Sequence, residues 1–334
     1  MRLSILDLAP IRPGETPADS FAASVTLAQR AEQCGYLRVW YAEHHNMATI
    51  ASSAPSVLVA HVAAHTRTIR LGAGGVMLPN HAPLTVAEQF GTLESLHPGR
   101  IDLGLGRAPG SDQVTMRALR RSASSADTFP DDVLELQGYL SGESRVPGVD
   151  ATPGKGTNVP LYLLGSSSFG ARLAAALGLP YAHASHFSPE MLQEAVAAYR
   201  SAFRPSRQLA QPYVIAGCNV VAADTHEDAE EQFHDARRRR VVSMLGRGRR
   251  IDDEEADALL ASPAGVRVQQ MLAYSAVGTP AEVAGYLEAF VVHAAADEVI
   301  TAHQSPTAAQ RVHSVELLAA AAGLTGSAAG TAAR

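Results

Sequence analysis

The feature that most restricts the fold is a recurrent pattern of short apolar, β-branched runs, each followed by a turn signal and an alanine-rich helical segment. Eight runs have the character of strands: Leu3 to Leu8, Leu37 to Tyr41, Ile69 to Leu78, Ile101 to Leu105, Leu161 to Leu164, Tyr181 to Ala184, Tyr213 to Ala222 and Glu298 to Thr301. Strands that alternate with helices are typical of a parallel sheet, in which each strand needs a crossover connection. The pattern therefore predicts an α/β protein.

Boundary signals support the helices between these runs. Ala18 to Gly35 ends on glycine, Pro83 to Leu96 opens with proline, and Thr279-Pro-Ala-Glu has the form of a capping box. The G-x-G-x-x-G motif of dinucleotide-binding sheets is missing after the first run, where Asp7-Leu-Ala-Pro-Ile-Arg-Pro-Gly stands instead. Eight strand–helix units without that motif favour a (β/α)8 TIM barrel over residues 1–322. The remaining segment, 323–334, is expected to be a disordered tail.

Two intervals are longer than the repeat and follow strands 4 and 7 of the predicted barrel. They are Arg107 to Pro160 and Arg237 to Val277, and such insertions usually form lids or pocket walls, although poorly ordered loops are the alternative. The second contains Arg237-Arg-Arg-Arg and Arg247-Gly-Arg-Arg, followed by Asp252-Asp-Glu-Glu. We interpret these runs as a solvated, self-compensating pair of charged helices rather than an anion-binding site.

Composition excludes several classes of partner. The chain has 334 residues and a formal net charge of −6, so its overall charge does not attract nucleic acid or an anionic membrane surface. Neither a secretory leader nor a long apolar stretch is evident, which predicts a cytoplasmic protein. The two cysteines, Cys34 and Cys218, do not suggest a disulfide framework. A small, neutral or amphiphilic substrate is the expected partner.

Functional groups in a barrel gather where the strands end. The polar residues at these ends are Glu43, His44, His45, Arg107, Ser166, Ser167, Ser168 and His186. The serines belong to Gly165-Ser-Ser-Ser-Phe-Gly-Ala, which precedes a helix, so that backbone N–H groups and hydroxyls there can bind a phosphate. An ordinary serine N-cap is the alternative. Arg107, at the neighbouring strand end, favours phosphate binding because its guanidinium can reach the same anion.

Two further patterns bear on a cofactor. His44 and His45 lie at a strand end, but the first strand ends without histidine, so no metal is predicted and a structural role remains open for either residue. Gly72-Ala-Gly-Gly-Val-Met-Leu-Pro places glycines inside a strand, where they normally mark close approach by a backbone or a ligand. A flat cofactor against this strand would explain them.

Four motifs together resemble the bacterial luciferase-like monooxygenases in order and spacing. They are Tyr41-Ala-Glu-His-His-Asn, Ile69-Arg-Leu-Gly-Ala-Gly-Gly-Val-Met-Leu-Pro, Leu96-His-Pro-Gly-Arg-Ile-Asp-Leu-Gly-Leu-Gly-Arg and Leu164-Gly-Ser-Ser-Ser-Phe-Gly-Ala-Arg-Leu-Ala, and His183-Ala-Ser-His-Phe follows them. Each motif is weak alone. In register, they extend the resemblance over almost the whole chain.

The resemblance implies a barrel that binds reduced FMN at its C-terminal face. The phosphate is then expected near Arg107 and Ser166 to Ser168, with Phe169 of the same motif in the cofactor site. His44 matches the family's active-site histidine, and Gly74-Gly75 matches a cis peptide beneath the flavin ring. The resemblance also implies a homodimer formed through the helical segments Pro55 to His65 and Pro83 to Leu96.

The resulting expectation is a two-component monooxygenase. It would take reduced FMN from a separate NAD(P)H:flavin reductase and use O2 to oxygenate a small organic substrate, with His44 exchanging protons. Two alternatives stay open: a deazaflavin-dependent dehydrogenase or reductase on the same barrel, and a non-catalytic flavin-binding protein. The sequence does not identify the substrate, and bioluminescence is not predicted.

Overall fold

Eight parallel strands close into a barrel in the computed structural model, which describes residues 1–108, 112–246, 249 and 251–325. The barrel strands are β1 (Leu3–Asp7), β2 (Arg38–Tyr41), β3 (Arg70–Met77), β4 (Ile101–Gly106), β5 (Leu161–Gly165), β6 (Tyr181–His183), β7 (Val214–Ala222) and β9 (Glu298–His303). Each pairs with its neighbours in chain order, β6 pairs with β7, and β9 joins β7 to β1. The predicted TIM barrel is confirmed, with every expected strand within two residues of its observed bounds.

A ninth strand, β8 (Ser275–Gly278), was not predicted from the sequence, which placed this segment at the end of the second insertion. β8 pairs with Asn219–Ala222 in the C-terminal half of β7. The three residues of β6 pair with Val214–Ala216 on the same edge, so β8 continues that edge beyond the end of β6. Four residues with small side chains at both ends give too short an apolar run to indicate a strand.

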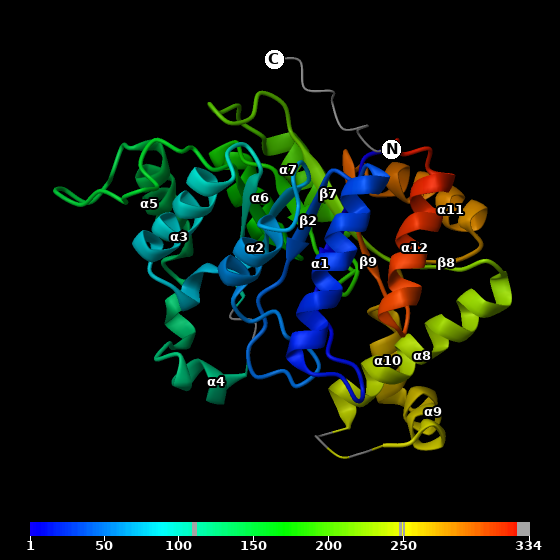
Figure 1. Ribbon diagram of the computed structural model, residues 1–334. Coiled ribbons are helices and arrows are strands. Elements are labelled where there is room, and N and C mark those ends of the chain that lie inside the picture. Colours follow the sequence, from blue (N-terminus) through cyan, green and yellow to red (C-terminus); the bar gives the residue numbers. More distant parts are fainter. Residues whose placement is uncertain (109–111, 247–248, 250, 326–334) are drawn as a thin grey trace.

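Helices surround the barrel on all sides (Figure 1). They are α1 (Pro17–Cys34), α2 (Pro55–Ala63), α3 (Pro83–Leu96), α5 (Phe129–Ser141), α6 (Ser168–Leu177), α7 (Leu192–Ala202), α8 (His226–Leu245), α11 (Pro280–His293) and α12 (Ala308–Ala321). The expected boundaries are confirmed: α1 ends at Gly35, whose φ of 89° suits glycine, and Thr279 and Glu282 form the capping box of α11.

Part of each insertion lies at the end of the barrel where the strands terminate, whereas α5, which also belongs to the first insertion, packs beside α3. The first contains α4 (Gln113–Ala118) and a 3₁₀ turn (Ala123–Ala126), and the second contains α9 (Asp253–Ala261) and α10 (Pro263–Gln270). In Figure 1, α4 and α9 both lie at the lower end of the molecule, whereas the N-terminus lies at the upper end. These parts of the insertions are therefore placed to wall the C-terminal face, as expected. Of the expected disordered tail, 323–334, only residues 323–325 are described, and the rest lies outside the described residues.

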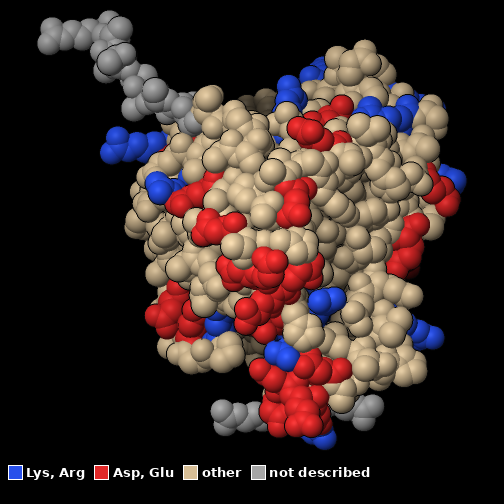
Figure 2. Space-filling model, turned by 90° about the vertical axis from the view of Figure 1, so that its right-hand side faces the viewer, with Lys and Arg blue, Asp and Glu red and all other residues tan. Residues whose placement is uncertain are grey.

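The outer surface of the second insertion is strongly charged. Figure 2 shows acidic side chains gathered over α8 and α9. Arg238 of α8 lies among them: its Nε donates to Asp257 Oδ1 at 2.8 Å, and its Nη1 is 3.3 Å from Asp253 Oδ2. The prediction of a self-compensating charged helix pair is confirmed for this arginine.

The end of the barrel interior near the strand N-termini, which is the upper end in Figure 1, is closed by a buried ionic network. Arg38 lies between two carboxylates, with Nη1 2.7 Å from Asp102 Oδ2 and Nε 3.0 Å from Glu298 Oε1. Arg38 is 5% exposed, and both carboxylates are fully buried. Tyr162 accepts a hydrogen bond from Arg38, and Tyr213 donates one to Glu298, at 2.7 Å in each case. Charged and polar side chains, rather than apolar ones, therefore fill this end of the barrel interior.

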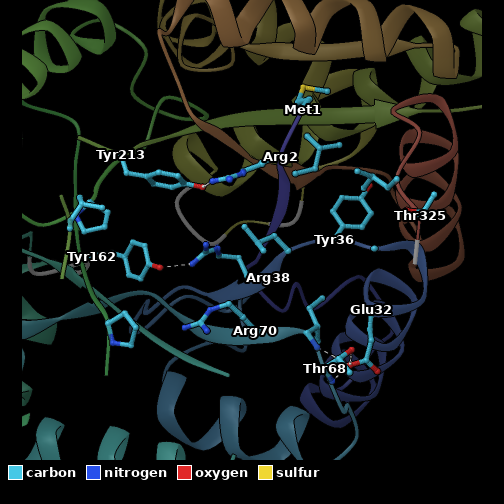
Figure 3. A pocket seen from close by; sticks show the side chains of 18 of the residues that line it. Met1, Arg2, Glu32, Tyr36, Arg38, Thr68, Arg70, Tyr162, Tyr213 and Thr325 are labelled. Atoms are coloured by element: carbon cyan, nitrogen blue, oxygen red, sulfur yellow. Dashed lines mark hydrogen bonds between the residues drawn. The ribbon is translucent and has the colours of Figure 1, made fainter. Parts of the chain in front are cut away.

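A hollow of about 850 Å³ lies outside this network, at the N-terminal ends of the strands. Figure 3 shows Arg38 pointing toward Tyr162 and Arg2 toward Tyr213 along its wall. Arg70 contacts Asp102, with its Nε 3.0 Å from Oδ1. Because Arg38 and Arg70 are paired with carboxylates, we assign this end of the barrel to stability rather than to catalysis.

None of the helices in the described ranges is both long enough and apolar enough to cross a membrane.

Candidate active site

A cavity of about 660 Å³ opens at the C-terminal ends of the barrel strands, with α6 and α8 adding to its walls. Its volume lies in the range of small-molecule and cofactor sites, and barrels place their sites at this face. The predicted site residues that line it are His44, Gly74, Gly75, Arg107, Ser166, Ser167 and Phe169. Ser168 is not a lining residue, because the chain turns into α6 there and Ser168 becomes its first residue.

The N-terminus of α6 faces the cavity without a side-chain cap. Ser167 occupies the N-cap position, but its side chain makes no capping hydrogen bond. The alternative of an ordinary serine N-cap is therefore not realised. The first backbone N–H groups of a helix have no partner within the helix, and together with the helix dipole they form a binding site for an anion.

Arg107 lies beside this helix terminus. It directly follows β4, and its guanidinium carbon is 4.4 Å from the centre of the Phe169 ring in the first turn of α6. Its Nε donates to the carbonyl oxygen of Ala126 in the first insertion, at 3.3 Å. No carboxylate of the described chain pairs with Arg107. The stacking thus holds an uncompensated positive charge next to the α6 terminus.

Two glycines of β3 form the adjoining wall. The peptide between Gly74 and Gly75 is cis, as expected, and the register between β3 and β4 shifts across this pair. A Cβ on Gly74 would lie 2.9 Å from Trp40 Cβ, and one on Gly75 would lie 2.8 Å from the carbonyl oxygen of Gly104. Glycine is therefore required at both positions by the close packing of β3 on its neighbours.

His44 projects into the cavity from a segment fixed by its neighbours. Glu43 is fully buried and hydrogen-bonded to His45 Nε2 at 2.8 Å, His81 Nε2 at 2.9 Å and the Met77 N–H at 3.0 Å. Burial opposes the charge of Glu43, but the bonds from His81 and His45 hold its pKa below the usual value. His44, which stands between Glu43 and His45 in the chain, lines the cavity. His45 therefore has a structural role, and His44 is held toward the cavity.

Two other histidines line the cavity. His183 is 1% exposed, and neither of its ring nitrogens has a hydrogen-bond partner among the described residues. Burial lowers the pKa of His183 to about 4, and burial together with the nearby Arg240 lowers the pKa of His186 to about 3. Both rings are therefore neutral at pH 7. A neutral imidazole offers one donor and one acceptor, which suits the polar edge of a bound ring.

Helix α8 presents one face to the cavity. Its lining residues are spaced by three, four, three and one, which places them on one side of the helix: Phe233, Ala236, Arg240, Ser243 and Met244. The interpretation of the arginine run as wholly self-compensating is wrong for Arg240, which lines the cavity. Arg240 turns inward, whereas Arg238 turns toward the carboxylates of α9. Four consecutive arginines carry no sequence signal that distinguishes these directions.

His183 and Arg240 were therefore not predicted from the sequence as cavity residues. His186 was predicted only as a polar residue at a strand end. A metal site is not indicated, since no three His, Cys, Asp or Glu side chains of the described chain are grouped to hold an ion.

Comparison with known proteins identifies the family of the chain. The family model of the luciferase-like monooxygenases matches residues 1–298, and the chain belongs to this family. A luciferase-like monooxygenase of Escherichia coli (strain K12) is 48% identical over 317 residues, which cover 94% of this chain and 95% of the relative. The N-acetyl-S-alkylcysteine monooxygenase of Bacillus subtilis (strain 168) is 40% identical over 281 residues, covering 78% of this chain and 79% of that one.

Solved structures show the same barrel. The crystal structure of apo-MsnO8 has a TM-score of 0.88 and 35% identity, and the match covers 97% of this chain and 99% of that one. Two more distant structures share the fold alone. The oxygenating component of 3,6-diketocamphane monooxygenase from Pseudomonas putida, in complex with FMN, has a TM-score of 0.73 and 17% identity, covering 96% of each chain. An F420-dependent secondary alcohol dehydrogenase has a TM-score of 0.69 and 16% identity, covering 96% of this chain and 98% of that one.

Proposed function

We propose that this protein is a two-component flavin monooxygenase that binds reduced FMN in the C-terminal cavity. The observation that carries the proposal is the anion site formed by Arg107 and the uncapped N-terminus of α6, at the edge of a cavity whose wall is the Gly74–Gly75 segment. A single flat molecule with a phosphate tail fits both features. The relatives described as monooxygenases support oxygen chemistry in the same cavity.

The residues fit FMN in three respects. Arg107, Ser166 and Ser167, with the first N–H groups of α6, would hold the phosphate. The Gly74–Gly75 segment lacks side chains and would lie against the isoalloxazine ring. The unpartnered ring nitrogens of His183 would bind its polar edge. Bound reduced FMN would supply two electrons to O2, so that one oxygen atom enters the substrate and the other leaves as water.

His44 is the residue that we assign to proton transfer. It lies in the cavity wall and is held there by the fixed segment around Glu43. An imidazole nitrogen of His44 would give up or accept the proton that accompanies reduction of oxygen. The apolar side chains of Leu6, Leu8 and Ile300 would exclude water from the reaction.

A deazaflavin-dependent dehydrogenase is the second candidate, since the F420-dependent alcohol dehydrogenase shares the fold. The two are separated by supplying reduced FMN, through a flavin reductase, or reduced deazaflavin, under ¹⁸O2 with a panel of small organic acids, thioethers and ketones. A monooxygenase incorporates one labelled atom per turnover with FMN. Substrate-dependent oxidation or reduction with deazaflavin, without label, would favour the dehydrogenase. Binding of FMN without any turnover would indicate a flavin-binding protein.

We expect Arg107→Ala to weaken FMN binding by about 10- to 150-fold, which corresponds to about 1.5–3 kcal/mol for a charge-assisted hydrogen bond. Riboflavin lacks the phosphate, so its affinity should remain nearly unchanged. Titration of protein fluorescence with both ligands measures the difference. Arg172→Ala, on the exposed side of the same helix α6, is the control for loss of a positive charge. Equal losses for FMN and riboflavin would remove Arg107 from phosphate binding.

We also propose that the protein is a homodimer through α2 and α3. These helices contact each other, and Val57 of α2 is 68% exposed, as Leu96 at the end of α3 is at 65%. A two-fold interface would cover such apolar side chains on both copies at once. Light scattering at micromolar concentration should report a dimer, and Val57→Glu should shift it toward the monomer. A wild-type protein that is monomeric under these conditions contradicts the proposal.

A further inference from the structure

The charges that line the C-terminal cavity are all positive. Among its described lining residues are two arginines, Arg107 and Arg240, and neither an aspartate nor a glutamate. The two arginines come from different walls: Arg107 follows β4, and Arg240 belongs to α8. The phosphate of the proposed FMN, bound at the α6 terminus, would compensate Arg107. The charge of Arg240 is left for a second anionic group.

Arg240 differs from the other arginines of its run. Arg237 lies over the ring of Phe233, with 5.1 Å between the guanidinium carbon and the ring centre. Arg238 is paired with carboxylates, and Arg239 donates to the carbonyl oxygen of Gln304 at 2.9 Å. Arg240 makes no hydrogen bond or ion pair within the described chain, and its Nε is buried.

An unpaired guanidinium in a partly buried position is costly. Burial lowers the pKa of Arg240, which reflects the desolvation of its charge. Structural arginines usually recover this cost through a carboxylate, as Arg238 does on the same helix. A partly buried charge that lacks such a partner and faces a cavity is typical of a ligand-binding group.

The surroundings of Arg240 complete a polar wall. Ser243 follows it at i+3 on the same face of α8, and both side chains line the cavity. His186 lies close enough for Arg240 to lower its pKa, and its Nδ1 has no partner among the described residues. Hydrogen bonds fix the backbone of His186. The side-chain amide of Gln304 donates to Asn219 at 2.9 Å, and Asn219 donates to the carbonyl oxygen of His186 at 2.7 Å.

From this arrangement we infer that Arg240 binds the carboxylate of the organic substrate, so that the substrate class is a small organic acid with an apolar body. Arg240 would form a bidentate contact with the carboxylate, and the hydroxyl of Ser243 would add a donor. The apolar body would extend along the inner wall of Leu6, Trp40 and Ile300. This inference rests on the proposed function in one respect: FMN occupies the α6 side of the cavity and leaves the α8 side to the substrate.

The test compares carboxylates with their uncharged amides. Hexanoate and 4-phenylbutanoate, and the corresponding primary amides, are titrated calorimetrically into the FMN-loaded protein. We expect each carboxylate to bind at least about tenfold more tightly than its amide, as a charge-assisted contact predicts. Arg240→Gln should abolish this preference. Arg238→Gln, two residues away on the outer side of α8, should retain it, and thermal melting of both variants checks their fold.

Three results would overturn the inference. The first is no preference for the carboxylates in the wild-type protein, including failure of all four probes to bind. The second is an equal loss of the preference in both variants. The third is a tenfold loss of FMN affinity in Arg240→Gln, which would assign Arg240 to the flavin. Failure of the wild-type protein to bind FMN contradicts the proposed function instead, and the same titrations on the flavin-free protein still test the carboxylate site.

Discussion

Replacement of His44 by alanine is expected to lower the rate of product formation by about 10²- to 10⁴-fold, the usual contribution of a positioned acid–base group. FMN affinity should change by less than about threefold, because His44 is not part of the proposed phosphate site at α6. Rapid-mixing absorbance of the bound reduced flavin with O2, followed by product quantification, measures both quantities. The expected split is a large loss in kcat with little loss in flavin binding.

A conservative variant separates proton transfer from hydrogen bonding at this position. His44→Gln keeps a polar side chain of similar length but cannot exchange a proton, so it should be nearly as slow as His44→Ala. Full activity of the glutamine variant would assign His44 a hydrogen-bonding role only. Turnover of the alanine variant within a factor of two of wild type would remove His44 from the mechanism altogether.

Replacement of Arg38 by methionine is expected to lower the free energy of unfolding by about 3–5 kcal/mol, the cost of breaking a buried ion pair from one side. Burial opposes the charge of Arg38, but Asp102 and Glu298 keep its pKa above the usual value. Without Arg38, Glu298 would remain buried with hydrogen bonds from Ser4 and Tyr213 but without its ion-pair partner inside the barrel. Urea unfolding of the purified variant measures the loss.

Two further variants identify the source of this loss. Arg38→Met combined with Glu298→Gln should recover part of the stability, because the unpaired carboxylate is also removed. Arg70→Met should cost less than Arg38→Met, since Arg70 is only partly buried and Asp102 keeps Arg38 as a partner. A stability of Arg38→Met within about 1 kcal/mol of wild type would show that the network is not required at this end of the barrel.

The barrel could be predicted because its determinants are local. Each strand is an apolar run closed by a turn residue, and the helix boundaries follow from side chains within four positions, as Gly35 and the Thr279–Glu282 pair show. β8 was not predicted because its four residues do not form an apolar run closed by a turn residue. Its pairing depends on the free edge that the short β6 leaves on β7.

The candidate site was predictable where it follows from strand ends or from glycines inside a strand, as at Gly74 and Gly75. Arg107 and the serines before α6 are of the first kind, since a barrel brings consecutive strand ends together. The cluster of Glu43 with His81 depends on a contact between distant segments, which spacing along the chain does not encode. The direction of Arg240 depends on how α8 is rotated against the barrel. Periodicity in a run of four arginines cannot indicate that rotation.

A crystal structure of the protein with FMN would show directly whether the C-terminal cavity is the flavin site. We expect the phosphate at the N-terminus of α6, within hydrogen-bond distance of Arg107 and of a hydroxyl of Ser166 or Ser167. The ring should lie against Gly74–Gly75, with its polar edge near His183. The α8 side, with Arg240, should remain open to a second molecule. A phosphate bound by Arg240, or FMN located outside the C-terminal cavity, would contradict the proposed flavin site.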